Sequence, residues 1–139
     1  MIDMPQDMLE KISNALPNGT PCLLATADAD GRPDIGPNGS MMGFDSQHLA
    51  YWERTMRQHL ANLNENPNVV VLYWDRANRI NWRFHGSVEV YTEGPIREQI
   101  MVHTLKVEID RDTERKGCGI LIRVDKITNL GGQVLQSRE

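Results

Sequence analysis

Alternating apolar and polar residues indicate a chain built mainly from β-strands. The clearest alternation runs through residues 81–91, where one face carries Phe84 and Val88 and the other carries Arg83 and Glu89. Runs rich in apolar residues predict further strands at 22–26, from 33 onward, and at 48–52, 69–74 and 120–124. Turn-forming residues at 28–31 predict that the first two of these strands form a hairpin.

Apolar residues spaced three and four apart predict three helices. Residues 6–16 place apolar side chains on one face before a Pro-Asn-Gly sequence, and a second apolar stripe runs from Pro95 to residue 107. The third helix is predicted to begin near Thr55, because Thr55 and Gln58 have the spacing of a capping box, and to end before Pro67. Residues 35–44 fit neither period, since glycine and proline interrupt them.

These elements indicate one mainly β domain that spans residues 1–139. Strands of even length, joined mostly by tight turns with a few inserted helices, favour an antiparallel β-barrel with peripheral α-helices. An open, doubly wound sheet is the alternative. A chain of 139 residues buries enough surface to fold without a disulfide or a structural metal.

Composition and charge narrow the class of protein. Hydrophobic residues make up 40% of the chain and charged residues 24%, as in soluble globular proteins. The net charge of −4 argues against a nucleic-acid partner, because neutralising phosphates needs a dense basic face. Residues 1–16 predict neither a signal peptide nor a membrane span, so we expect a cytoplasmic protein. Cys22 and Cys118 lie far apart in apolar contexts and are predicted to be buried thiols.

Charges around the third predicted helix run against its dipole. Arg54 and Arg57 flank its start and Glu65 lies near its end, whereas a helix stabilises anions at its N-terminus. A bound phosphate would resolve this mismatch, since free N–H groups and guanidinium groups both donate hydrogen bonds to it. The alternative is that both arginines lie on a solvated face, partly paired with acids such as Glu53.

Several common catalytic signatures are missing from the sequence. The four histidines, including His48 and His85, have no metal-ligand spacing, so no metal site is expected. No G-x-S-x-G sequence occurs, and neither cysteine has a histidine nearby in the sequence. The glycine patterns of Rossmann folds and P-loops are also missing, which leaves a nucleotide site of those kinds unsupported.

Five short sequences occur in an order that resembles a known family. They are DGRP at 30–33, YW at 51–52, NL at 62–63, NPNV at 66–69 and FHGSVEV at 84–90. Together they resemble the small members of the pyridoxamine 5′-phosphate oxidase-like family of FMN-binding split barrels. The resemblance covers roughly residues 15–124. It implies a six-stranded antiparallel split barrel and a homodimer that binds FMN non-covalently in two grooves at its interface.

The resemblance also implies which residues contact the flavin. The phosphate would lie where a strand passes into the third helix, against Arg54, Thr55, Arg57, Gln58 and His59. His59 stands where family members often have a lysine.

Other positions would lie along the rest of the flavin. An amide in the strand before Gly86 commonly contacts the flavin or its phosphate in the family, and Asn81 matches it. The segment with Asn38, Gly39, Ser40 and Met41 matches the strand that lines the isoalloxazine ring, and Trp52 matches a position that touches the ring mainly through its backbone. For the segment at 38–41 an Asn-Gly turn is the alternative.

The resemblance predicts an FMN-dependent oxidoreductase with a small-molecule redox partner. The basic substrate-binding tail of true pyridoxamine phosphate oxidases has no counterpart in residues 130–139, so their substrate is not transferred to this chain. No side chain is nominated as a catalytic acid or base. Two alternatives remain: a flavin-binding electron carrier without turnover, and the same barrel binding a deazaflavin, or haem through His48 or His85.

Overall fold

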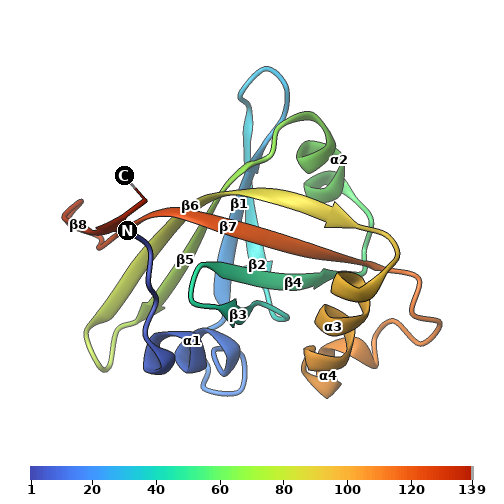
Figure 1. Ribbon diagram of the computed structural model, residues 1–139, viewed down its shortest axis with the longest axis horizontal. Coiled ribbons are helices and arrows are strands. Elements are labelled where there is room, and N and C mark those ends of the chain that lie inside the picture. Colours follow the sequence, from blue (N-terminus) through green and yellow to red (C-terminus); the bar gives the residue numbers. More distant parts are fainter. Residues whose placement is uncertain (139) are drawn as a thin grey trace.

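The computed structural model describes residues 1–138, which contain four helices and eight strands (Figure 1). The helices are α1 (Gln6–Ser13), α2 (Gln58–Glu65), α3 (Pro95–His103) and α4 (Lys106–Ile109). The strands are β1 (Cys22–Ala27), β2 (Pro33–Asn38), β3 (Met42–Asp45), β4 (His48–Glu53), β5 (Asn68–Asp75), β6 (Ile80–Tyr91), β7 (Cys118–Thr128) and β8 (Val134–Ser137). Strands therefore hold most of the regular structure.

All eight strands belong to one antiparallel sheet. Its order is β2-β1-β5-β6-β7-β4-β3, and β8 adds to β7 outside this path. The sheet curls around one interior, but its end strands β2 and β3 do not pair along the described chain, so the barrel stays open (Figure 1). The predicted split barrel is thereby confirmed, with eight strands rather than six. A doubly wound sheet is excluded, because such a sheet is mostly parallel.

The two extra strands carry only a weak hydrophobic signal in the sequence. β3 is only four residues long and follows the turn at Gly39 and Ser40. β8 lies in the polar tail, and its Val134 and Leu135 are 53% and 43% exposed. β8 is held mainly by backbone pairing with β7, whereas β3 pairs with β4 and also buries Met42, which is 5% exposed.

The core lies on the concave face of the curled sheet. Phe84, Gly86 and Val88 of β6 are buried, as the alternation predicts, while Glu89 is exposed. β6 and β7 change register beside Gly86, where a Cβ atom would lie 2.2 Å from the carbonyl oxygen of Arg123. Glycine is required there because the neighbouring backbone leaves no room for a side chain.

β4 is buried on both of its faces. Leu49 and Tyr51 point into the main core, and both are 0% exposed. Ala50 and Trp52 point the other way, into a smaller cluster that includes Ile100 of α3. This strand therefore connects the barrel interior to the helices at the end of the molecule that carries α3 and α4 (Figure 1).

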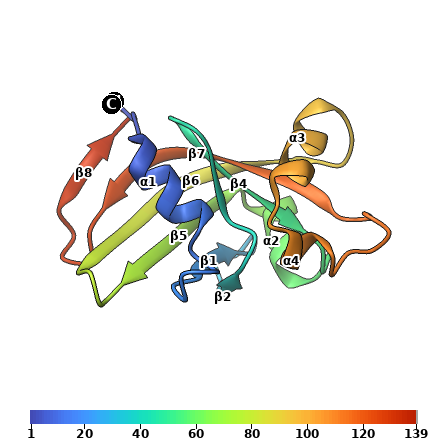
Figure 2. The same cartoon turned by 90° about the horizontal axis from the view of Figure 1, so that it is seen from below.

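All three predicted helices are shorter than the sequence predicts, and two of them differ at their C-terminal ends. α1 ends at Ser13 rather than near residue 16, and it packs against β3 beside the open part of the barrel (Figure 2). The helix predicted from Pro95 to residue 107 breaks at Thr104, whose hydroxyl donates a hydrogen bond to the Ile100 carbonyl at 2.8 Å. Thr104 and Leu105 have extended ψ angles of 137°, and α4 resumes the helical path at Lys106.

Cys22 and Cys118 are both buried and form no disulfide, as predicted. None of the helices within residues 1–138 is long and apolar enough to cross a membrane.

Candidate functional site

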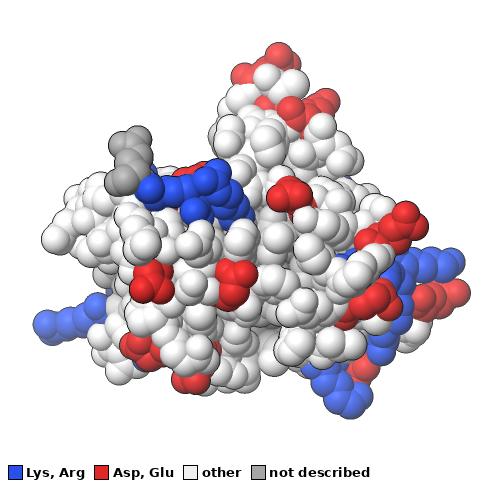
Figure 3. Space-filling view, in the orientation of Figure 1, with Lys and Arg blue, Asp and Glu red and all other residues white. Residues whose placement is uncertain are grey.

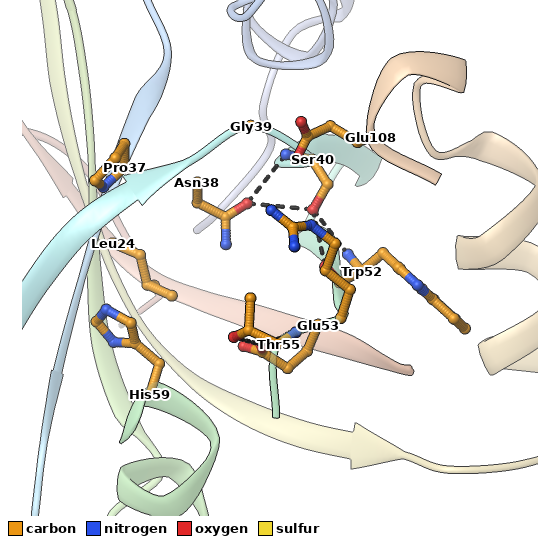
Figure 4. Close-up of a pocket in the computed structure, with 11 residues that line it drawn as sticks. Leu24, Pro37, Asn38, Gly39, Ser40, Trp52, Glu53, Thr55, His59 and Glu108 are labelled. Atoms are coloured by element: carbon orange, nitrogen blue, oxygen red, sulfur yellow. Dashed lines mark hydrogen bonds between the residues drawn. The ribbon is translucent and has the colours of Figure 1, made fainter. Parts of the chain in front are cut away.

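A pocket lies where the turn after β2, the end of β4 and the first turn of α2 meet (Figure 4). It encloses a cavity of about 100 Å³. Its walls come from four parts of the chain that are far apart in sequence, namely Leu24; Pro37, Asn38, Gly39 and Ser40; Trp52, Glu53, Arg54, Thr55 and His59; and Glu108. Seven of the eleven residues predicted to contact a flavin lie among them.

The first wall is a tight turn that ties β2 to β4. The Asn38 side-chain oxygen accepts a hydrogen bond from the backbone N–H of Ser40 at 3.2 Å, which closes the turn. The Ser40 hydroxyl accepts from the Trp52 backbone N–H and lies 3.1 Å from the Trp52 carbonyl oxygen. The alternative of a turn at Asn38 and Gly39 is therefore observed, and it follows directly on the strand that ends at Asn38.

Gly39 makes this turn possible at the place where α4 approaches it. A Cβ atom on Gly39 would lie 2.8 Å from the carboxyl carbon of Glu108. The Glu108 side chain is only 14% exposed and forms an ion pair with Arg111 at 3.7 Å. An acidic group is thus held against the small residues of the turn.

The start of α2 differs from the prediction. The helix begins at Gln58 with Arg57 as its N-cap residue, and no side chain caps it. The Thr55 hydroxyl does not form the predicted capping box, because it donates to Glu53 Oε2 at 2.9 Å. The same oxygen accepts from the backbone N–H groups of Thr55 and Met56 at 3.2 and 3.3 Å.

This arrangement makes residues 54–57 a loop rather than a first helical turn. Met56 has a φ of 55°, a left-handed conformation that is uncommon for a residue with a side chain. The Glu53 carboxylate, itself 7% exposed, holds the loop in this shape through its three hydrogen bonds. Capture of Thr55 by a neighbouring acid is the physical reason why the helix starts three residues late.

Arg54 lines the pocket, whereas Arg57 is exposed at the helix start. Neither arginine forms an ion pair with any side chain of residues 1–138. The alternative that they pair with nearby acids is therefore not observed. Figure 3 shows that charged groups of both signs mix on one face, over the end that carries α3 and α4.

His59 lines the pocket (Figure 4), and a hydrogen-bond chain through Thr26 orients its ring. Asn62 Nδ2 donates to the Thr26 hydroxyl at 2.9 Å, and that hydroxyl lies 2.8 Å from His59 Nδ1. Gln58 in turn donates to the Asn62 side-chain oxygen at 2.7 Å. Since the Thr26 oxygen already accepts a proton from Asn62, its own proton is available for His59 Nδ1. With this direction of donation, Nδ1 of His59 is the acceptor, and the tautomer expected is the one that carries its proton on Nε2.

Four predicted contact residues lie outside the pocket of a single chain. Met41 is 3% exposed and packs in the main core, and Arg57 and Gln58 lie on the outer side of the helix start. Asn81 lies near the other end of the sheet, where its side-chain oxygen accepts from the Leu130 backbone N–H at 2.7 Å. A single chain does not bring Asn81 to the other predicted residues.

The sequence reasoning missed two acidic residues in the pocket, Glu53 and Glu108. Glu53 follows the Tyr-Trp sequence directly, so its place at the strand-to-helix junction was a usable signal. Glu108 had no such signal, because it reaches the pocket only through the break between α3 and α4.

The wall behind Trp52 is fixed by Asp112. The Trp52 indole N–H donates to Asp112 at 2.9 Å, and the Gly117 backbone N–H donates to the same carboxylate oxygen at 2.8 Å. Burial raises the pKa of Asp112, but these hydrogen bonds, with one from Lys116 and the charge of Arg115, hold it below its usual value of 3.8. The indole is therefore anchored away from the pocket, and Trp52 faces it mainly through its backbone.

The two histidines considered for haem lie in different surroundings. His48 pairs with Asp45 at 2.7 Å near the surface. His85 lines a second, more apolar cavity of about 370 Å³, together with Ala25, Val69 and Val70. Burial, then the charges of Lys126 and Arg83, lower the pKa of His85, so it is neutral at pH 7. A neutral imidazole is the form that binds metals.

Comparison with known proteins agrees with the fold. Residues 8–120 match the profile of the family described as pyridoxamine 5′-phosphate oxidase. A single-residue variant of HupZ from Group A Streptococcus is 33% identical over 94% of this chain and 100% of that chain, with a TM-score of 0.73. A search of curated protein sequences gives no match.

Two more distant structures share the fold. An FMN-binding protein from Syntrophomonas wolfei is 17% identical over 94% of this chain and 90% of that chain, with a TM-score of 0.69. HutZ, the haem storage protein from Vibrio cholerae, is 16% identical over 89% of this chain and 96% of that chain, with a TM-score of 0.66. The profile match covers most of the sequence, and the chain therefore belongs to the pyridoxamine 5′-phosphate oxidase family of split barrels.

Proposed function

We propose that this protein binds FMN in the pocket between β2, β4 and α2 and acts as an FMN-dependent oxidoreductase. The observation that carries the proposal is the meeting of seven predicted flavin contacts in one pocket, although they come from three separate elements. The family resemblance implies those residues independently of the geometry. Their convergence supports a shared ligand more strongly than any one of them does.

The residues present fit the parts of FMN unequally. Asn38, Gly39 and Ser40 offer small side chains and backbone groups that suit the edge of a planar ring. Arg54 supplies a guanidinium and His59 an imidazole ring nitrogen as donors for a phosphate. When bound, the flavin supplies the hydride and electron transfer, and these residues bind and orient it.

A second copy of the chain would complete the site. The cavity of about 100 Å³ is small beside the roughly 300–1,000 Å³ of typical ligand pockets, so one chain encloses only part of a flavin. The convex faces of β1, β2 and β5 also carry partly exposed apolar side chains, with Ile35 63% and Trp74 46% exposed. We therefore propose a homodimer with FMN at its interface, and light scattering after size exclusion tests it.

An absorption spectrum with reconstitution tests the cofactor. We expect the protein to retain FMN after desalting and to melt at a higher temperature with excess FMN, because a ligand that binds only the native state stabilises it. A colourless protein whose melting temperature does not respond to FMN would refute the proposal. Oxidation of an electron donor faster than by free FMN separates an oxidoreductase from an electron carrier.

A substitution locates the phosphate. Arg54→Ala should weaken FMN binding by about tenfold or more, since a hydrogen bond to a charged group contributes about 1.5–3 kcal/mol. Arg123→Ala is the matched control, because the Arg123 side chain is 55% exposed, pairs with Asp125 on β7 and lies outside this pocket. Equal FMN affinities for both variants would place the phosphate elsewhere.

A second candidate is haem binding through His85. It is favoured by the apolar cavity that His85 lines and by the neutral state of this imidazole. Its ring nitrogen Nε2 lies 3.3 Å from the Thr128 hydroxyl, so a metal would have to displace that contact. A Soret band after haem titration that His85→Ala abolishes and His48→Ala retains would support this candidate over FMN.

A further inference from the structure

Glu53 occupies the hydrogen-bond donors that a flavin phosphate would use in this pocket. Its Oε2 accepts from the Thr55 backbone N–H, the Thr55 hydroxyl and the Met56 backbone N–H, at 3.2, 2.9 and 3.3 Å. Three donors that converge on one oxygen are the arrangement expected around a phosphate oxygen. Here the chain supplies the anion itself, from the last residue of β4.

The Glu53 carboxylate is buried and has no cationic partner. It is 7% exposed, and no arginine, lysine or histidine of residues 1–138 lies within 4.0 Å of it. Burial is the main cause that raises the pKa of Tyr51 and of Cys118. The negative charge of Glu53 is the second cause for both residues, and the pKa of Cys118 reaches about 11. The three donors of the loop are therefore its main stabilisation.

The other carboxylate of the pocket is arranged differently. Glu108 pairs with Arg111 and lies against the turn at Gly39, away from the Thr55 donors. Only Glu53 therefore competes directly for the groups that would hold a phosphate. A phosphate monoester on the same donors would bring a charge of about −1.5 to −2 next to this carboxylate. Like charges in contact repel strongly in a partly buried site.

We propose that Glu53 is an internal competitor for the phosphate group, and that it sets how well this site distinguishes phosphorylated from unphosphorylated flavins. The inference rests on the proposed flavin function. A bound phosphate must either displace the Glu53 side chain from the Thr55 loop or bind beside it with Arg54 and His59 only. In both cases the phosphate adds less affinity than the basic residues of the helix start suggest.

Parallel titrations with FMN and riboflavin test this inference, because the two ligands differ only in the phosphate. In the unmodified protein we expect FMN to bind less than about tenfold more tightly than riboflavin, a difference of roughly 1.4 kcal/mol. In Glu53→Gln the ratio should rise at least tenfold through tighter FMN binding, with riboflavin affinity changed by less than about threefold. Flavin fluorescence quenching measures both affinities.

The matched control is Glu65→Gln, which removes one negative charge from α2, the helix that follows Glu53 in the chain. Glu65 is exposed at the far end of α2, where its carboxylate accepts from the Ala29 backbone N–H. We expect this variant to leave the FMN-to-riboflavin ratio unchanged. An equal rise in both variants would show a general charge effect and overturn the specific role of Glu53.

The remaining outcomes separate this inference from the proposed function. Flavin binding with an unchanged ratio in Glu53→Gln overturns the inference and leaves the function standing. Binding of neither flavin to either protein overturns the function and the inference with it. If Glu53→Gln does not fold, the unmodified protein still decides, because an FMN preference above about tenfold, or roughly 1.4 kcal/mol, is incompatible with an internal competitor.

Discussion

Replacing Thr26 by valine should disturb both the stability of the barrel and the state of His59. Valine keeps the shape of the side chain but removes the hydroxyl that accepts from Asn62 and lies 2.8 Å from His59 Nδ1. Thr26 is 3% and Asn62 is 2% exposed, so water does not readily replace the lost partner. One unsatisfied buried amide costs about 1–3 kcal/mol, and we expect the free energy of unfolding to fall by that amount.

The matched control is Thr26→Ser, which keeps the hydroxyl and loses a methyl group. Its expected cost is about 1 kcal/mol from lost apolar burial, so stability alone separates the two variants only at the upper end of the range. The decisive measurement is the imidazole ¹⁵N spectrum of His59. The Nε2-protonated form should dominate in the unmodified protein and in Thr26→Ser.

In Thr26→Val the His59 ring loses the donor that holds its Nδ1 unprotonated, so the two tautomers should mix. Urea unfolding, followed by circular dichroism, gives the stability change for both variants. The reasoning fails if Thr26→Val unfolds with the same free energy as the unmodified protein and its His59 spectrum does not change. It also fails if the unmodified protein already has Nδ1 protonated.

Three further predictions concern the barrel and the buried thiols. Gly86→Ala should lower the free energy of unfolding by about 1–3 kcal/mol, because its Cβ would overlap a carbonyl oxygen of β7, whereas Gly131→Ala should change it little. Folding lowers the pKa of Asp112, so the stability that its carboxylate contributes is complete above the usual pKa of 3.8 and is lost as the pH falls below that value. Between pH 5 and about pH 3, the melting temperature of Asp112→Asn should therefore drop less than that of the unmodified protein. Cys22 and Cys118, whose pKa values burial raises to about 12 and about 11, should react with a thiol reagent at pH 8 only after unfolding in urea.

The strands of the barrel were predictable because their signal is local. Burial of alternate residues in β6 follows from the alternation of apolar and polar residues in its sequence. The break at Thr104 was not predictable, since a threonine hydroxyl bonds back to a carbonyl in continuous helices as well. β8 lacked a signal because only its backbone pairs with β7.

Most residues of the candidate site could be predicted from the sequence, but their hydrogen-bond partners could not. Thr55 has two possible partners close in sequence, the Glu53 carboxylate behind it and the Gln58 backbone N–H ahead of it. Either partner satisfies its hydroxyl. The choice between them depends on the burial of Glu53 at the end of β4, which long-range pairing with β7 decides. Glu108 arrives from more than fifty residues away, so no local pattern places it at Gly39.

The double burial of β4 divides the pocket into a part that opens only with the whole protein and a part that opens on its own. Amide protons of β4 should exchange with solvent as slowly as any in the chain, since both core clusters must separate before the strand is exposed. The loop at 54–57 has no such cover and includes the left-handed Met56. A ligand would thus contact a rigid wall formed by β4 and a loop at 54–57 that it must order. The conformational entropy that the loop loses would lower the affinity.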